Sequence, residues 1–149
     1  MTEYTPTLLA DGFTFLEGPR WHQGRLWVSD MWGFKAWAVA PDGARELLFE
    51  LAERPSGMGF LPDGTPLVVS MANRKVLKLV GGKLVEHADL SALATGDCND
   101  MVVDAEGRAY VGNFGYDLLG GEEAKPAALV RVDADGSARK VADGLNFPN

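Results

Sequence analysis

The sequence predicts an all-β protein of the β-propeller class, with about three blades of four antiparallel strands each in this chain. Three observations lead to this prediction. A unit of a short apolar segment, a polar turn and an alternating strand recurs, and its turn glycines Gly24, Gly64 and Gly107 lie about 40 residues apart. A second series of turns falls between these glycines. Helical periodicity is scarce, and the stretch 88–96 is expected to be a connecting loop with a turn or two.

The first unit begins with RWHQGRLWVSD (20–30), in which the turn at Gly24 separates two short strand-like segments. The turn PDG (41–43) then joins AWAVA (36–40) to ARELLFE (44–50). Glycine and aspartate supply the positive φ that tight hairpin turns need. Each unit therefore predicts a sheet of four short strands.

The second and third units repeat this order. The second consists of GFLPDGTPLVVSMA (59–72), KVLKLV (75–80) and KLVEHA (83–88), and the third of MVVDAEGRAYVGNF (101–114), ALVRVD (128–133) and SARKVA (137–142). The segments VVSM and AYVGNF are mostly apolar at successive positions, so they are predicted to be innermost strands covered by neighbouring blades. A β-sandwich is the alternative, and the doubled turn series at a constant period favours the propeller.

Composition predicts a packed, acidic domain. Hydrophobic residues make up 46% and charged residues 23% of 149 residues, and the net charge is −7. An acidic chain argues against nucleic acid and anionic membrane surfaces as partners. The single cysteine, Cys98, excludes an intrachain disulfide, and the N-terminus has no signal-peptide pattern, so a cytoplasmic location is expected.

The three units do not account for a closed ring. Propellers have about 4–8 blades, and GLNFPN (144–149) has the pattern that opens a fourth unit. We therefore expect residues 1–149 to be the N-terminal half of a single propeller domain whose C-terminal half is not in this chain. A natural end, a truncation and a cut between Asn149 and a following glycine all remain open as origins of this ending.

Candidate site residues lie in the segments expected to join each outer strand to the next inner strand. These segments are FLEGPRW, RPSGMGF, DCNDMVVD and GLNFPN, and they carry Glu17, Ser56-Gly57, Asn99-Asp100 and Asn149. Equivalent loops of a propeller converge near its axis, so these side chains are expected to meet there. A carboxylate with amide oxygens is a hard-oxygen set that suits calcium, magnesium or manganese, and zinc could also be accepted.

The motifs FLEGPRW, PSGMGFLPDG, NDMVVDAEGRAYVGNFG and GLNFPN together resemble the senescence marker protein/gluconolactonase/luciferin-regenerating enzyme family, the regucalcin-like lactonases. The resemblance covers the chain from Phe13 to Asn149. It implies a six-bladed propeller of roughly twice this length, one divalent metal ion on the axis, and hydrolysis of a lactone. Calcium is the favoured ion, with zinc, manganese and magnesium as alternatives.

The same resemblance implies roles for individual residues. Glu17 and Asn149 correspond to metal ligands, and Asn99 corresponds to a substrate-binding amide near the metal. The remaining ligand, an acidic residue that also serves as general base, belongs to a later blade, so no catalytic base is assigned within this chain. Some relatives carry an arginine two residues before the Asn of the ND motif, where this chain has Asp97. Asp97 and Tyr116 are further candidates for substrate binding, and Asp97 argues against a sugar-acid lactone.

The implied reaction is metal-assisted hydrolysis of a small-molecule lactone, completed by the C-terminal half as a second polypeptide. One alternative is a non-catalytic interaction module that homodimerises into a closed ring and places two copies of Glu17 and Asn99 on the axis. A third possibility, a propeller like strictosidine synthase with a different reaction, ranks lowest because such proteins lack the LEGP, ND and FPN set.

Overall fold

The computed structural model describes residues 4–149, and in this range it contains twelve β-strands and no helix. The strands form three four-stranded antiparallel sheets, each in chain order. The sheets contain β1 (Leu16–His22), β2 (Arg25–Asp30), β3 (Lys35–Val39) and β4 (Arg45–Glu50); β5 (Pro55–Phe60), β6 (Pro66–Ser70), β7 (Lys75–Val80) and β8 (Lys83–Asp89); and β9 (Cys98–Val103), β10 (Ala109–Asn113), β11 (Ala127–Val132) and β12 (Ala138–Leu145). The predicted all-β fold with three blades of four strands is confirmed. Accordingly, nothing within residues 4–149 forms a helix able to cross a membrane.

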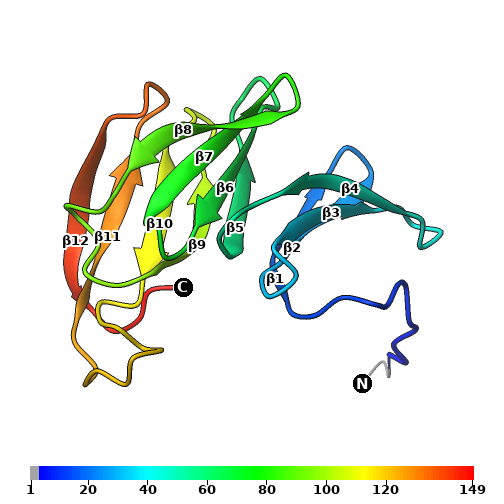
Figure 1. Ribbon diagram of the computed structural model, residues 1–149. Helices are drawn as coiled ribbons and strands as arrows, with labels where there is room; N and C mark the ends of the chain where they lie inside the picture. The colour runs from blue at the N-terminus through cyan, green and yellow to red at the C-terminus, as the bar shows by residue number, and fades with distance from the viewer. Residues whose placement is uncertain (1–3) are drawn as a thin grey trace.

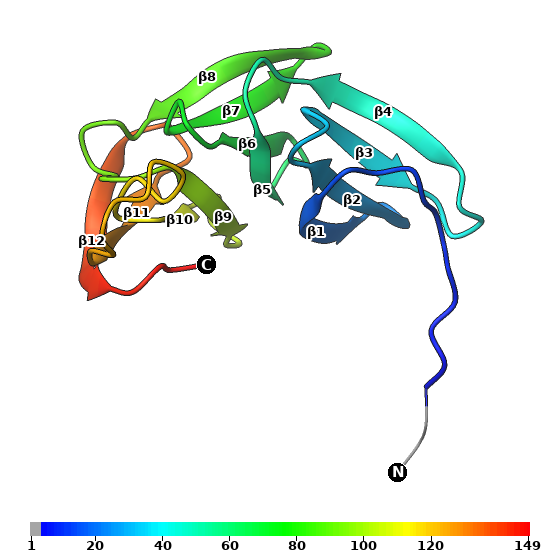
Figure 2. The same cartoon turned by 60° about the horizontal axis from the view of Figure 1, so that its bottom comes forward.

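The three sheets stand side by side along an arc, as blades stand around a propeller axis (Figure 1). β4, β8 and β12 lie on the outside of the arc, whereas β1, β5 and β9 lie on its concave side (Figure 2). These three innermost strands contact one another. Residues from three different blades therefore meet on the concave side.

The recurring glycines lie in the hairpin turns. Gly24, Gly64 and Gly107 have φ angles of 74°, 85° and 78° and join the first and second strands of their blades. Gly43 and Gly136, with φ angles of 85° and 88°, join the third and fourth strands of the first and third blades. A side chain with a Cβ is strained at such angles. The glycine period in the sequence is thus the period of the hairpins.

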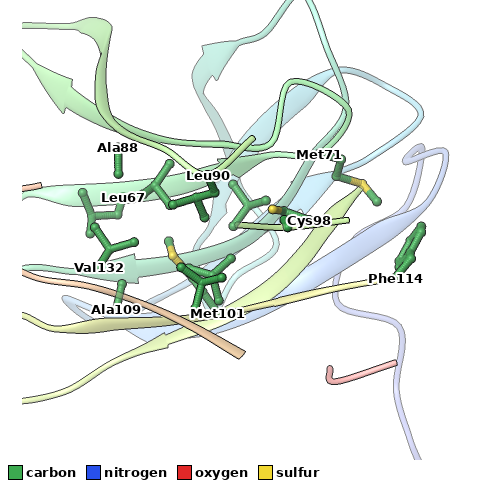
Figure 3. Packing of buried hydrophobic residues seen from close by; sticks show 14 residues of the cluster. Leu67, Met71, Ala88, Leu90, Cys98, Met101, Ala109, Phe114 and Val132 are labelled. Carbon is green, nitrogen blue, oxygen red and sulfur yellow. The ribbon is translucent and has the colours of Figure 1, made fainter. Parts of the chain in front are cut away.

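The hydrophobic core lies between neighbouring blades. β6, in the central blade, is buried on both faces: Val68 packs toward the first blade with Trp27, whereas Leu67 and Val69 pack toward the third blade with Val111. Figure 3 shows the second of these clusters, which fills the space between the central and third blades. Three sheets with two separate cores between them exclude the β-sandwich, which has one core between two sheets.

The position of the innermost strands differs from the prediction. The segments FLEGPRW, RPSGMGF and DCNDMVVD were expected to be loops, but they form β1 except for His22, β5 and β9 on the concave side (Figure 2). The segments VVSM and AYVGNF, expected to be innermost, fall largely in β6 and β10, which are second from the axis. The prediction was therefore wrong on this point, because the strands expected to be innermost are the second strands of their blades.

Close packing around the axis explains why these inner strands resemble loops in sequence. A Cβ on Gly18 would lie 2.8 Å from the carbonyl oxygen of Ser56 in the neighbouring blade. A Cβ on Gly57 would overlap the backbone of Asp100 and Met101 in the next blade. Glycine within a strand often marks a close backbone approach of this kind. At Gly57 the neighbouring strand requires glycine, and at Gly18 a φ angle of 56° adds to the close approach.

Candidate functional site

Each innermost strand carries an irregularity at the same place. The pairing register shifts after Glu17 in β1, after Pro55 in β5 and between Cys98 and Met101 in β9. Such a β-bulge locally disrupts the hydrogen-bond ladder and changes the direction of a side chain. At this bulge the strands carry Glu17, Ser56 and Asn99 in equivalent positions, each directly after the first paired residue of its strand.

The three residues at the bulges line one pocket of about 170 Å³ together with Asn149. The structure thus brings together four polar side chains that lie in separate sequence motifs. Much of the remaining wall is apolar, and it includes Trp32, Phe114, Leu118, Leu119 and Phe147. The pocket therefore has a polar cluster on the inner strands and an apolar surface around it.

Asn99 is the most constrained residue of this cluster. Its side chain is buried, and its Nδ2 donates a hydrogen bond of 3.2 Å to Oδ1 of Asn149. Within residues 4–149, Oδ1 of Asn99 is buried and has no hydrogen-bond partner. A buried polar atom without a partner is unfavourable, so this oxygen is suited to interact with a bound ligand.

The C-terminal segment is held in place by two contacts. Phe147 stacks on Phe114 with ring centroids 4.5 Å apart and an interplanar angle of 12°. Pro148 passes over Gly112, where a Cβ would overlap its carbonyl and would lie 2.6 Å from Oδ1 of Asn99. These contacts position Asn149 beside Asn99, although Asn149 itself is exposed.

Glu17 and Ser56 differ in whether their polar groups already form hydrogen bonds. Glu17 is half-buried, and its carboxylate forms no hydrogen bond or ion pair in the part of the chain that the structure describes. The buried Ser56 accepts a hydrogen bond of 2.6 Å at its carbonyl oxygen from the hydroxyl of Ser29, which joins the first two blades. Glu17 therefore offers a free carboxylate, whereas the backbone of Ser56 serves to hold two blades together.

Sequence reasoning missed Arg54, which lines the same pocket. Its Nη2 donates to Oδ2 of Asp97 at 2.7 Å, and its Nε donates to Oε1 of Glu53 at 2.9 Å. Its guanidinium carbon lies 5.2 Å from the centre of the Trp32 ring, a cation–π distance. The feature of the sequence that could have identified Arg54 is its position directly before the PSG motif.

The other two predicted substrate-binding residues are placed differently. Asp97 lines a second, more open depression with Arg74, Asp117 and Glu122, and it reaches the axial pocket through its ion pair with Arg54. Tyr116 is half-buried and lies outside the residues that line the axial pocket in the described range. The substrate-binding roles of Asp97, Tyr116 and Asn99 stay predictions, as do the metal-binding roles of Glu17 and Asn149.

Two negative findings limit the chemistry available to residues 4–149. No group of three or more His, Cys, Asp or Glu side chains in this range could hold a metal ion by itself. Cys98, next to Asn99, is buried between blades, and burial raises the pKa of its thiol to about 12. A neutral, buried thiol is a poor nucleophile. The donor set of the pocket is therefore one carboxylate with amide oxygens.

A pocket lined by one polar residue from each successive inner strand is typical of a β-propeller protein with its site on the axis. Residues 15–149 match the family model described as the SMP-30/Gluconolactonase/LRE-like region, and the chain belongs to this family. The family resemblance expected from the sequence is confirmed.

Individual relatives agree with this assignment. The chain is 30% identical over 136 residues to pentonolactonase XacC of Haloferax volcanii, a match that covers 89% of this chain and 44% of the relative. A gluconolactonase structure from Xanthomonas campestris matches with a TM-score of 0.76 and 20% identity, covering 91% of this chain and 49% of that one.

A calcium-binding protein, regucalcin, from Agrobacterium tumefaciens matches with a TM-score of 0.63 and 23% identity, covering 88% of this chain and 45% of that chain. At these identities the two solved structures establish the fold alone. The chain spans about half the length of each of these three relatives.

Proposed function

We propose that this chain is the N-terminal half of a metal-dependent lactonase, a carboxylic ester hydrolase whose site lies on the propeller axis. The observation that carries the proposal is the single pocket in which Glu17, Asn99 and Asn149 come together. Membership of a family with named lactonases supports the reaction class.

The residues of the pocket fit a hard divalent cation. The carboxylate of Glu17 is unpaired in the described range, and the side-chain oxygen of Asn149 lies in the same pocket, held by Nδ2 of Asn99. Carboxylate and amide oxygens are the ligands that calcium prefers. Glu17 and Asn149 would hold the ion, beside Asn99, with calcium as the favoured metal and zinc, manganese or magnesium as alternatives.

A cation held by Glu17 and Asn149 would polarise the lactone carbonyl and stabilise the charge that develops on its oxygen. The residues of this chain have three further tasks. Nδ2 of Asn99 orients the side-chain oxygen of Asn149 through its hydrogen bond of 3.2 Å. The stacked rings of Phe114 and Phe147 fix the segment that carries Asn149. The aromatic side chains of Trp32, Phe114 and Phe147 line the pocket and offer apolar surface to the carbon atoms of a lactone.

Hydrolysis also needs a group that accepts a proton from the attacking water. Cys98 is excluded by its raised pKa, and Glu17 is assigned to the cation. We assign the general base to the second half of the propeller. This assignment makes activity a property of the two halves together.

The uncovered face of the third blade supports a second half. Val102 is 60% exposed on this face, and Tyr110 and Leu129 are half-buried beside it. These three residues line another pocket with Arg20 and Pro148. An exposed apolar patch on a sheet marks an interaction surface. We propose that a fourth blade covers it, in the same polypeptide or in a second one.

The same apolar face also favours one alternative, a non-catalytic module that closes by homodimerisation. Two measurements separate the alternatives. The first is the mass of residues 1–149 in solution, alone and with the second half. The second is hydrolysis of a panel of lactones by each species. Activity only in the completed propeller supports the lactonase, whereas an inactive homodimer of 149-residue chains supports the module. Full activity of the isolated chain would contradict the assignment of the base.

A further inference from the structure

Arg54 joins three blades at the edge of the axial pocket. It lies directly before β5 of the second blade, its ion-pair partner Asp97 lies directly before β9 of the third, and Trp32 follows β2 of the first. The Arg54 residue is only 8% exposed. A buried arginine held by two carboxylates and an aromatic ring has one fixed orientation.

The hydrogen bonds of Arg54 leave part of its guanidinium free. An arginine has five N–H donors. Nε is used by Glu53 and Nη2 by Asp97, while Nη1 donates no hydrogen bond to any residue between 4 and 149. Because the side chain lines the pocket that contains Glu17 and Asn99, these donors can serve a ligand there.

The charges around Arg54 indicate which ligand group it would take. The two carboxylates that contact Arg54, those of Glu53 and Asp97, outnumber its single positive charge. A carboxylate or phosphate on the ligand would meet this excess of negative charge. A neutral hydroxyl group accepts a hydrogen bond from the guanidinium without that repulsion.

We propose that Arg54 is a specificity-determining residue that donates hydrogen bonds to hydroxyl oxygens of the substrate, with Asp97 and Glu53 as the residues that position it. This inference rests on the proposed lactonase function and assigns the recognition of ring hydroxyl groups to an arginine supplied by the neighbouring blade. Asp97 then acts through Arg54 rather than by touching the substrate.

The test compares two lactones in the completed propeller, residues 1–149 together with the second half. A pentono-1,4-lactone carries ring hydroxyl groups, and γ-butyrolactone has the same ring without them. The double variant Arg54→Met/Asp97→Asn removes the guanidinium together with the negative charge of its partner Asp97. We expect the ratio of kcat/KM for the hydroxylated lactone over γ-butyrolactone to fall about 10- to 100-fold, since a site built to bind hydroxyl groups discriminates strongly.

Two further variants separate recognition from structure. Arg108→Met/Asp104→Asn removes a similar ion pair, with Nε 2.6 Å from Oδ2, outside the lining of the axial pocket, and should leave the ratio unchanged. Asp97→Asn should raise KM for the hydroxylated lactone with a smaller effect on kcat, and Asp97→Glu should restore the ratio in part. An equal loss for both lactones in the Arg54 variant would show that Arg54 only holds the blades together, and the proposal would be wrong.

A binding measurement distinguishes failure of this inference from failure of the lactonase proposal. A hydroxylated γ-lactam resists hydrolysis, and its binding can be followed by calorimetry. If the native protein hydrolyses neither lactone but binds the lactam, and the Arg54 variant loses that binding, the recognition of hydroxyl groups stands and the reaction class does not. If the native protein also fails to bind the lactam, the inference about Arg54 is overturned.

Discussion

The side-chain nitrogen of Asn99 lies 3.2 Å from the side-chain oxygen of Asn149, a residue 50 positions further along the chain. This hydrogen bond connects the bulge of β9 to the segment that follows β12. It leaves Oδ1 of Asn99 buried and without a partner among residues 4–149. One amide group thus orients a second one and still offers an acceptor of its own.

Replacing Asn99 should therefore weaken cation binding without removing a proposed ligand. In the completed propeller, Asn99→Ala is expected to lower the affinity for Ca²⁺ or Mn²⁺ by about 10-fold or more, as for other residues that orient metal ligands. Titration calorimetry measures this affinity. Asn73→Ala, which removes a hydrogen bond of 3.1 Å to Ser70 in the turn after β6, is the control and should leave it unchanged. Equal affinities in native protein and Asn99→Ala would contradict the orienting role.

Glu17→Gln keeps the size of the side chain and removes its charge. Because the Glu17 carboxylate has no partner in the described range, its loss should change the free energy of unfolding by less than about 0.5 kcal/mol. Activity of the completed protein is expected to fall at least about 100-fold, because charge stabilisation in the transition state depends on the bound cation. Lactone hydrolysis and urea unfolding together check this contrast. Glu123→Gln, at an exposed position, should alter neither quantity.

Gly112→Ala tests the close packing beneath Asn149. The new Cβ would overlap the carbonyl of Pro148 and lie 2.6 Å from Oδ1 of Asn99, so we expect a loss of about 1–3 kcal/mol in unfolding free energy and weaker cation binding. Gly24→Ala has open space around its Cβ but a φ of 74°, so it should lower stability alone. Unchanged cation affinity in Gly112→Ala would show that the position of Pro148 is unimportant for the site.

Val102→Asp tests the uncovered face of the third blade. Val102 is 60% exposed, so a charge there should leave the circular dichroism spectrum of residues 1–149 unchanged. On an interface the same charge would be desolvated, which is unfavourable. We expect the variant to lose association with the second half, or with a second copy, in analytical ultracentrifugation. Association equal to that of the native chain would place the contact elsewhere.

Cys98 offers a probe of blade separation. Burial raises the pKa of its thiol to about 12, well above the usual value, so the group is protonated and neutral at pH 8. We expect a disulfide reagent to leave the native protein unlabelled at this pH and to label it fully in urea, where the thiol regains an ordinary pKa near 8.5. Rapid labelling of the native protein would mean that the second and third blades open readily.

Much of the fold could be predicted because its turns depend on local chemistry. The turns at Gly24, Gly64 and Gly107 each need a positive φ at one residue, and glycine adopts it most easily. The repeat of the turns therefore appears in the sequence as a repeat of glycines. The axial residues Glu17, Asn99 and Asn149 could be proposed for a related reason. Each occupies the same place in a repeated unit, and equivalent places in a propeller converge.

The order of strands within a blade could not be predicted in the same way. Gly18 and Gly57 lie in motifs that resemble loops, and only the structure shows the neighbouring inner strand that leaves no room for a Cβ at either position. Arg54 and Asp97 lie 43 residues apart in sequence, and their ion pair forms only because the second and third blades pack together. The expectation that Asp97 disfavours a sugar-acid lactone considered that residue without the arginine beside it.

The sequence by itself therefore determined the all-β class, the period of the blades and the equivalent places of Glu17, Asn99 and Asn149 within it, because each depends on turn geometry or on position within a repeat. Only the tertiary structure decided which strands are innermost and which charges meet at the pocket. The reason is physical: strand packing and ion pairing depend on the approach of neighbouring blades, and that approach is set by contacts between residues far apart in the chain.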